Sequence, residues 1–415
     1  MKQMLNLLHV NTSKCIGCTR CMRICPTEAI RIIDKKATLA TDKCIYCGRC
    51  FQTCQVNAIQ VNANQRSDLE EGKYHIAILP IAIYGMIKSK EDLNVIYHAL
   101  YDQGFNEVFE LSPVYKVLSE KIEAYVQQHH DYPYILTQCP TILKLTQLNH
   151  TSLVSKFLPF NFPYEIVAQY IKLKHIKQLN LDVSQVRVSY ITECLANLHA
   201  ISDAVGKHNS EIDHVFLLST LFKDILKHLE ATHQQSISTQ RDGILWAKVG
   251  ALRRTTDIHE YLSVDGISYV GTILEKVELN QLDHIKLLEC YSCVSGCVGG
   301  TFTLENPFVA KTKINGLYEQ LTESDDEFTK TLRQLEDISW EFEKPLEQFA
   351  RRALDEDFMT SLMKLQAINQ LYEQLPQIDC CACGSPSCRA LAEDVVSGKK
   401  QFEDCVVRNK REEKN

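Results

Sequence analysis

The chain has 415 residues, of which 45% are hydrophobic and 23% are charged, and this length is enough for two or three domains. No apolar stretch approaches the roughly 20 residues of a membrane span, and the opening segment MLNLLHV is too short for a signal peptide. We therefore exclude a membrane-spanning or exported protein and expect a cytoplasmic one.

The charge distribution limits the partners. The net charge of −7 is too small to identify one, but residues 1–60 contain nine Lys or Arg against three Asp or Glu. The same segment holds eight cysteines and lacks an array of aromatic and basic side chains, so we expect no nucleic-acid partner.

The first region, residues 1–62, contains an internal repeat, in which CIGCTRCMRICPTEAI (15–30) recurs as CIYCGRCFQTCQVNAI (44–59). Cysteines of a cytoplasmic chain stay reduced, so their spacing indicates metal or redox chemistry rather than disulfides. The spacing C-x2-C-x2-C-x3-C is typical of two-cluster ferredoxins, in which the fourth cysteine of each repeat binds the other cluster. The alternative is a pair of zinc sites, but zinc sites rarely show such an interlocking double repeat. The predicted [4Fe-4S] ligands are a first ferredoxin set, Cys15, Cys18, Cys21 and Cys54, and a second ferredoxin set, Cys44, Cys47, Cys50 and Cys25.

After a polar linker, residues 74–352 alternate short apolar runs with helical patterns. The runs HIAIL, YIL, VRVSYI and HIKLL predict strands. Leu93, Ile96, Tyr97 and Leu100 share one helix face, and Gly104 suits the end of that helix. This alternation predicts an α/β domain with one mostly parallel sheet, behind an α+β ferredoxin-like domain.

The last region, residues 353–415, is predicted to be a small helical module. A helical apolar face ends before Pro376. Four cysteines follow in the spacing C-x2-C-x4-C-x16-C, which fits a further [4Fe-4S] cluster, with zinc as the alternative. Cys381 has no predicted role. The helix face consists of Phe358, Leu362, Leu365, Ile368, Tyr372 and Leu375, and the C-terminal thiol set is Cys380, Cys383, Cys388 and Cys405.

Four cysteines of the middle region follow predicted strands. Loops at the carboxyl ends of parallel strands converge, so these scattered thiols are expected to meet. Taken alone, Cys139 or Cys194 is better explained as a buried apolar residue. That explanation fails for CYSCVSGCVGG, whose glycines Gly296, Gly299 and Gly300 would let the backbone approach a bulky inorganic ligand. Cys290 has no predicted role. The middle thiol set is Cys139, Cys194, Cys293 and Cys297.

Over most of residues 74–312 the sequence resembles the catalytic domain of iron-only ([FeFe]) hydrogenases. CVSGCVGGTFTLENPFVA carries the resemblance most strongly, and DCCACGSPSCRALAEDVV is similar to the C-terminal module of the sensory branch. The resemblance implies that the middle thiol set holds a cubane. It also implies that the sulfur of Cys297 bridges this cubane to a di-iron subsite.

Other residues that the resemblance marks as catalytic are replaced. Gln138 stands where a proton-shuttling cysteine is expected, and Tyr291 stands in place of a methionine. The motif PCxAKK of the family reads ECLANLH here, so Glu193 replaces the proline and Asn197 replaces a lysine that contacts a cyanide. Each change also fits tolerated drift. Together they favour a site that kept its cubane and lost its di-iron half.

The sequence therefore predicts an iron–sulfur electron-transfer protein with about four [4Fe-4S] clusters. Its expected partner is a redox protein, such as a ferredoxin or flavoprotein, or a signalling protein. The main alternative is a low-activity or sensory [FeFe] hydrogenase with the complete cofactor, and a weaker one is a reductase acting on another small molecule. No glycine fingerprint for NAD or flavin is evident.

Overall fold

The computed structural model describes residues 7–89, 91–225, 239–322, 325–348, 354–355 and 357–412. The chain divides into two compact units. The middle unit consists mainly of residues 62–347, and the terminal unit joins residues 8–61 to the C-terminal part from residue 348. The predicted boundary at residues 352–353 lies outside the described residues.

The ferredoxin-like part of the terminal unit repeats in structure as it does in sequence. Each of its two short helices begins after a residue in the left-handed region, Thr19 with a φ of 65° and Gly48 with a φ of 71°. Strand β1 pairs antiparallel with β4, and β2 pairs antiparallel with β3 in a hairpin. These elements are β1 (Leu8–Val10), α1 (Arg20–Ile24), β2 (Ile30–Ile33), β3 (Lys36–Leu39), α2 (Arg49–Thr53) and β4 (Ile59–Val61).

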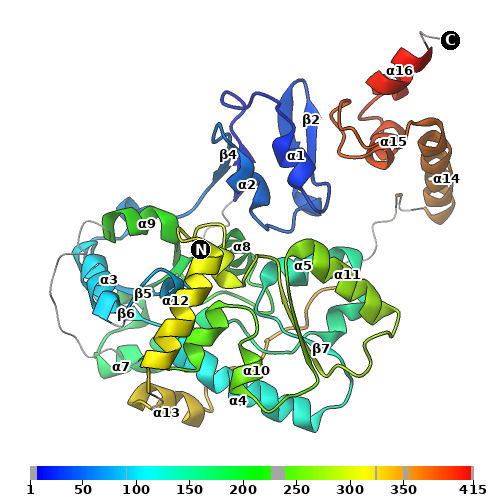
Figure 1. Cartoon of the computed structure of the whole chain (residues 1–415). Helices are drawn as coiled ribbons and strands as arrows, with labels where there is room; N and C mark the ends of the chain where they lie inside the picture. Colours follow the sequence, from blue (N-terminus) through cyan, green and yellow to red (C-terminus); the bar gives the residue numbers. More distant parts are fainter. Residues whose placement is uncertain are drawn as a thin grey trace. The chain divides into compact units, whose positions relative to one another are not determined.

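The middle unit is an α/β domain with parallel strands, as predicted, but its described strands form two sheets rather than one (Figure 1). The sheets run in the orders β6-β5-β8-β9 and β10-β11-β7. They separate because the two-residue strand β7 pairs with β11 and not with β5 or β8. The strands are β5 (Tyr74–Ile78), β6 (Glu107–Phe109), β7 (Tyr134–Ile135), β8 (Val186–Thr192), β9 (His214–Leu217), β10 (Tyr261–Asp265) and β11 (Leu287–Tyr291).

Helices connect these strands, as parallel pairing requires. The predicted helix is α3, which buries Leu93, Ile96 and Leu100 and ends before Gly104, whose φ is 104°. The helices are α3 (Glu91–Asp102), α4 (Ser112–Gln128), α5 (Pro140–Asn149), α6 (Pro163–Tyr170), α7 (Ile176–Gln178), α8 (Leu195–Ser202), α9 (Leu218–Ile225), α10 (Leu252–Thr255), α11 (Ile267–Glu278), α12 (Pro307–Gln320) and α13 (Glu327–Gln334).

Strands β5 and β8 lie in the core. Ile76, Ile78 and Val188 are fully buried, which fits a parallel sheet covered on both faces. The carboxyl end of β8 leads directly into Cys194, and that of β11 leads toward Cys293. The fold therefore places Cys194 and Cys293 two residues after the ends of these strands.

The C-terminal part contains α14 (Phe358–Gln374), α15 (Cys388–Val396) and α16 (Val406–Glu412). Ile368 and Leu375 pack in a cluster with Leu391 of α15. Phe358, in contrast, is 77% exposed, and Leu362 and Leu365 are also exposed. The predicted apolar face is therefore buried only in the second half of α14, because the nine-residue α15 is too short to cover all of it.

Candidate metal centres

The eight cysteines of the ferredoxin-like part gather in two groups. Cys21 interacts with Cys15, Cys18 and Cys54, and burial raises the pKa of its thiol to about 11. All eighteen cysteines of the chain are free thiols. This first group has the membership that the repeat predicts.

The second group forms around Cys50. Its thiol interacts with Cys47, Cys44 and Cys25, and burial is the main cause that raises its pKa. Burial also raises the pKa of Cys47 to about 11, and Cys25 is again among its neighbours. The structure thus brings Cys25 from the first repeat to the thiols of the second repeat.

Backbone N–H groups point at the sulfur atoms of both groups. The amide of Ala29 donates to the Sγ of Cys25, and the amide of Ala58 donates to the Sγ of Cys54, each at 3.2 Å. These two bonds occupy equivalent places in the repeat. Hydrogen bonds to the sulfurs are among the features that tune an iron–sulfur cluster, and both groups provide one.

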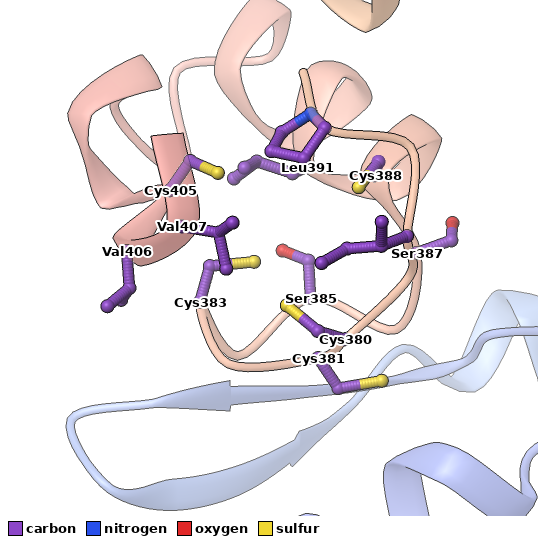
Figure 2. Close-up of a pocket in the computed structure, with 12 residues that line it drawn as sticks. Cys380, Cys381, Cys383, Ser385, Ser387, Cys388, Leu391, Cys405, Val406 and Val407 are labelled. Carbon is purple, nitrogen blue, oxygen red and sulfur yellow. The ribbon is translucent and has the colours of Figure 1, made fainter. Parts of the chain in front are cut away.

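The C-terminal thiol set lines one small pocket, which has a volume of about 10 Å³. Figure 2 shows the sulfurs of Cys380, Cys383, Cys388 and Cys405 turned toward this space, whereas that of Cys381 points away from it. The Sγ of Cys381 donates to the carbonyl oxygen of Pro386 at 3.1 Å. The four thiols that the sequence spacing selects are therefore the ones that face the pocket.

The middle thiol set comes from the ends of three strands. Cys139 caps α5 after β7, and Cys194 caps α8 after β8 and accepts a hydrogen bond from an amide of that helix. Cys293 and Cys297 follow β11. Cys297 interacts with the other three, and burial raises its pKa well above the usual range. The predicted convergence of these thiols is therefore present, although two different sheets supply the strands.

The glycines of the loop after β11 are packed against other backbone segments. Gly296 has a φ of 91°, and a Cβ there would lie 2.7 Å from the amide nitrogen of Val249. A Cβ at Gly300 would lie 2.6 Å from the carbonyl oxygen of Glu193. Both glycines are therefore needed where the loop packs against other backbone segments, and the approach of the backbone to an inorganic ligand stays a prediction.

Glu193 and Asn197 form a buried network beside Cys297. The hydroxyl of Tyr190 donates to Glu193 at 2.9 Å, and the side-chain amide of Asn197 donates to the other carboxyl oxygen at 3.4 Å. Glu193 also shares a side-chain hydrogen bond with Cys297. Burial is the main cause that raises the pKa of Glu193.

Several tyrosines around this network were not predicted from the sequence. Tyr115 and Tyr164 interact with Glu193 and Cys194, and Tyr164 stacks on Tyr190 at 4.7 Å between ring centroids. Tyr115 lies on α4 and Tyr164 on α6, so no local pattern links either to the cysteines. The sequence offered one signal for this network. It is the close spacing of three polar side chains around the turn from β8 to α8, namely Tyr190, Glu193 and Asn197.

Three buried donor groups near the middle thiol set have no hydrogen-bond partner among the described residues. They are the Nε2 of Gln138 and the hydroxyls of Tyr164 and Tyr291. Cys297 interacts with Tyr291, and Gln138 directly precedes Cys139. Buried polar groups normally find a partner, so these donors fit a site whose bound group carries sulfur acceptors.

The remaining cysteine, Cys290, is buried on β11, and burial raises its pKa.

Within the described parts of the chain, no three His, Cys, Asp or Glu side chains are arranged to hold a single metal ion. No helix in those parts is long and apolar enough to cross a membrane.

Three family models match separate parts of the chain. Residues 7–55 match a 4Fe-4S dicluster domain, residues 78–245 match the C-terminal domain of the iron-only hydrogenase large subunit, and residues 375–407 match an Fe-S cluster domain. The hydrogenase match includes Cys139 and Cys194 and ends before Cys293. No curated protein matches the chain.

The chain is similar, at low identity, to solved structures of [FeFe] hydrogenases. A structure of HydA(deltaEFG), which reveals stepwise H-cluster assembly, is 13% identical with a TM-score of 0.48. A variant of HydA1 from Chlamydomonas reinhardtii has the same identity and TM-score. Each match covers 66% of this chain and 91% of the other.

Proposed function

Since the chain is an iron–sulfur protein related to the iron-only hydrogenases, we propose that it passes electrons between protein partners and carries no di-iron site. Four [4Fe-4S] clusters, each able to take up and release one electron, would supply the redox chemistry. The ligands would be the two ferredoxin sets, the middle thiol set and the C-terminal thiol set.

The protein itself would tune these sites through hydrogen bonds and burial. Backbone amides such as those of Ala29 and Ala58 donate to ligand sulfurs, and Gln138, Tyr164 and Tyr291 offer further buried donors in the middle unit. Donors near sulfur and exclusion of solvent are the main controls on the potential of a cluster. Both units would therefore offer hydrogen-bond donors to the clusters that they hold.

The Glu193 network is the observation that argues against a di-iron site. By the resemblance, a lysine at position 197 would place a positive charge against an anionic cyanide. Here the amide of Asn197 is already bonded to Glu193, and a carboxyl group stands beside the sulfur of Cys297. A neutral amide gives a weaker contact with an anion than an ammonium does.

The residue before Cys139 supports the same conclusion. Gln138 is buried and has no ionisable proton, so it cannot relay protons as a thiol would. Hydrogen turnover needs both a di-iron site and a proton path. The chain therefore lacks the lysine that would contact the di-iron site and the thiol that would relay protons.

Infrared spectroscopy tests this proposal directly. The protein, co-produced with the hydrogenase maturation machinery, should show no bands from iron-bound carbon monoxide or cyanide and no hydrogen uptake or evolution. A known [FeFe] hydrogenase produced in the same cells serves as the positive control. Carbonyl bands in this protein would overturn the proposal. They would support the alternative, a low-activity or sensory hydrogenase with the complete cofactor.

The proposed partners are redox proteins, a ferredoxin or a flavoprotein, and the proposed location is an anaerobic cytoplasm, where free thiols persist. Anaerobically purified protein should contain about sixteen irons, as four cubanes of four irons each. Iron near eight together with stoichiometric zinc would restrict the clusters to the ferredoxin-like part.

A further inference from the structure

Within the terminal unit, the C-terminal loop (residues 379–388) packs against the β2–β3 hairpin. The backbone amide of Ile32 donates to the carbonyl oxygen of Gly384 at 2.8 Å. Gly384 has a φ of 80°, and a Cβ there would lie 2.3 Å from the carbonyl oxygen of Ile32. The two backbones approach so closely that glycine is required at this position.

A buried ion pair fixes the same contact. The Nε of Arg31 lies 2.6 Å from the Oδ2 of Asp394, and the two side chains are only 13% and 8% exposed. Ser385 donates to the same carboxylate at 2.8 Å, and Arg31 also donates to the carbonyl oxygen of Glu28 at 2.6 Å. A buried pair with its bonding groups satisfied sets the geometry of an interface more than its strength.

The charges of the two surfaces are complementary. Lys43, next to Cys44, lies 3.4 Å from Glu393, the neighbour of Asp394. The basic side chains come from the ferredoxin-like part and the acidic ones from α15. Complementary charges fix the register of a contact, and this use accounts for part of the basic character of residues 1–60.

Predicted ligands of two different clusters border one cavity at this interface. The cavity has a volume of about 480 Å³, and Cys25 and Cys380 both line it. Arg23, between them, lies 3.5 Å through its Nη2 from the carbonyl oxygen of Cys380. One cysteine of the second ferredoxin set and one of the C-terminal thiol set therefore border the same space.

We propose that this interface is an internal electron-transfer contact between the second ferredoxin set and the C-terminal thiol set. The inference rests on the proposed function, because it requires a cluster at each set. With a cluster held by each set of thiols, one electron would pass from the reduced cluster to the oxidised one, and no proton or bond would be exchanged. A low-potential ferredoxin or dithionite supplies the electron. Electrons would then reach the C-terminal thiol set from the ferredoxin-like part without passing through the middle unit.

Electron paramagnetic resonance of the reduced full-length protein tests the contact. Two adjacent paramagnetic clusters interact magnetically, and Cys25→Ser and Cys383→Ser should each abolish that interaction by removing one cluster. Arg31→Glu should keep about sixteen irons but lose the interaction. It should also slow reduction of the C-terminal cluster by about tenfold or more, as measured by rapid freezing.

Lys35→Glu is the matched control. It makes the same charge change on an exposed residue of the same hairpin and should leave the interaction and the rate unchanged. Gly384→Ala breaks the contact from the C-terminal loop and should have the same effect as Arg31→Glu. Agreement between the two variants would show that the effect does not arise from a folding defect of the hairpin alone.

A wild-type C-terminal cluster that is magnetically isolated, and that is reduced as fast in Cys25→Ser as in the wild type, would overturn the inference. Iron near sixteen in that case leaves the proposed function standing. Iron near twelve without a C-terminal signal would overturn both, so the iron content separates the two failures.

Discussion

The ferredoxin-like part and the middle unit gather their thiols in different ways. In the first, three thiols of each set lie within seven residues and the fourth comes from the other copy of the repeat. In the second, the thiols lie between Cys139 and Cys297 and meet only because three strands end at one place. Spacing determines the first kind of site, and topology determines the second.

The two regions also differ in their most exposed thiol. Cys18 of the ferredoxin-like part is exposed, whereas no cysteine of the middle thiol set is, and burial raises the pKa values of Cys139, Cys194 and Cys297. A cluster in the ferredoxin-like part can therefore be altered from the surface. A change at the middle thiol set disturbs the core.

The largest expected effect comes from Cys194→Ser. It should remove about four of sixteen irons and lower the thermal stability of the middle unit, because the other three thiols of the set would lose the cluster that they hold together. Iron analysis and calorimetry measure the two effects. Cys18→Ser should also remove about four irons but leave the unfolding of the middle unit unchanged. Equal destabilisation by both would contradict the distinction between the two kinds of site.

The buried acid Glu110 tests how strongly the middle unit excludes water. Burial raises its pKa from 4.5 to about 8, and Tyr84 and Thr239 donate hydrogen bonds to it. The folded state therefore favours the protonated acid. This contribution to stability is complete below pH 4.5 and is lost as the pH rises through about 8.

Glu110→Gln should remove this pH dependence, which amounts to at most about 5 kcal/mol. Denaturant unfolding at pH 5 and pH 9, followed by the fluorescence of Trp246 and Trp340, measures it. Both tryptophans lie in the middle unit. The exposed Glu275→Gln is the control. A wild-type stability that does not fall between these pH values would contradict the prediction.

A smaller effect is expected at the loop that carries Cys293 and Cys297. Gly296→Ala should destabilise the middle unit by about 3 kcal/mol, because alanine rarely adopts a φ of 91° and its Cβ would meet Val249. Gly271→Ala, within α11, should instead stabilise it by about 1 kcal/mol, because the added Cβ would meet no other atom within 4 Å. The same fluorescence measurement compares the two variants.

The smallest effect belongs to Cys381→Ser. Its sulfur points away from the pocket in Figure 2, so the iron content should stay unchanged. The neighbouring change Cys383→Ser should remove about four irons. Loss of iron from both variants would show that Cys381 is a ligand.

Sequence reasoning predicted the parts of the molecule that depend on local spacing. The gathering of the ferredoxin thiols followed from the repeat, although their division into two ligand sets stays a prediction, and α3 followed from its periodicity and Gly104. The division into two sheets did not follow, because it depends on β7, which has only two residues and pairs with a strand about 150 positions away. Short strands carry little periodic signal.

The candidate site in the middle unit was predicted in its thiols but not in its surroundings. The sequence showed that Glu193 and Asn197 replace other residues, but not that they bond to each other. The ion pair between Arg31 and Asp394 likewise has no local signal, because 363 positions separate its partners. Contacts of this range become visible only once the chain is folded.

The separation between Arg31 and Asp394 also has a consequence for biosynthesis. At about 5 to 20 residues per second, a ribosome needs about 20 to 70 s between synthesis of the β2–β3 hairpin and synthesis of its partner residue. During this interval the middle unit can fold, while the surface that later receives the C-terminal loop stays uncovered. The terminal unit is thus completed only after the whole middle unit has been synthesised.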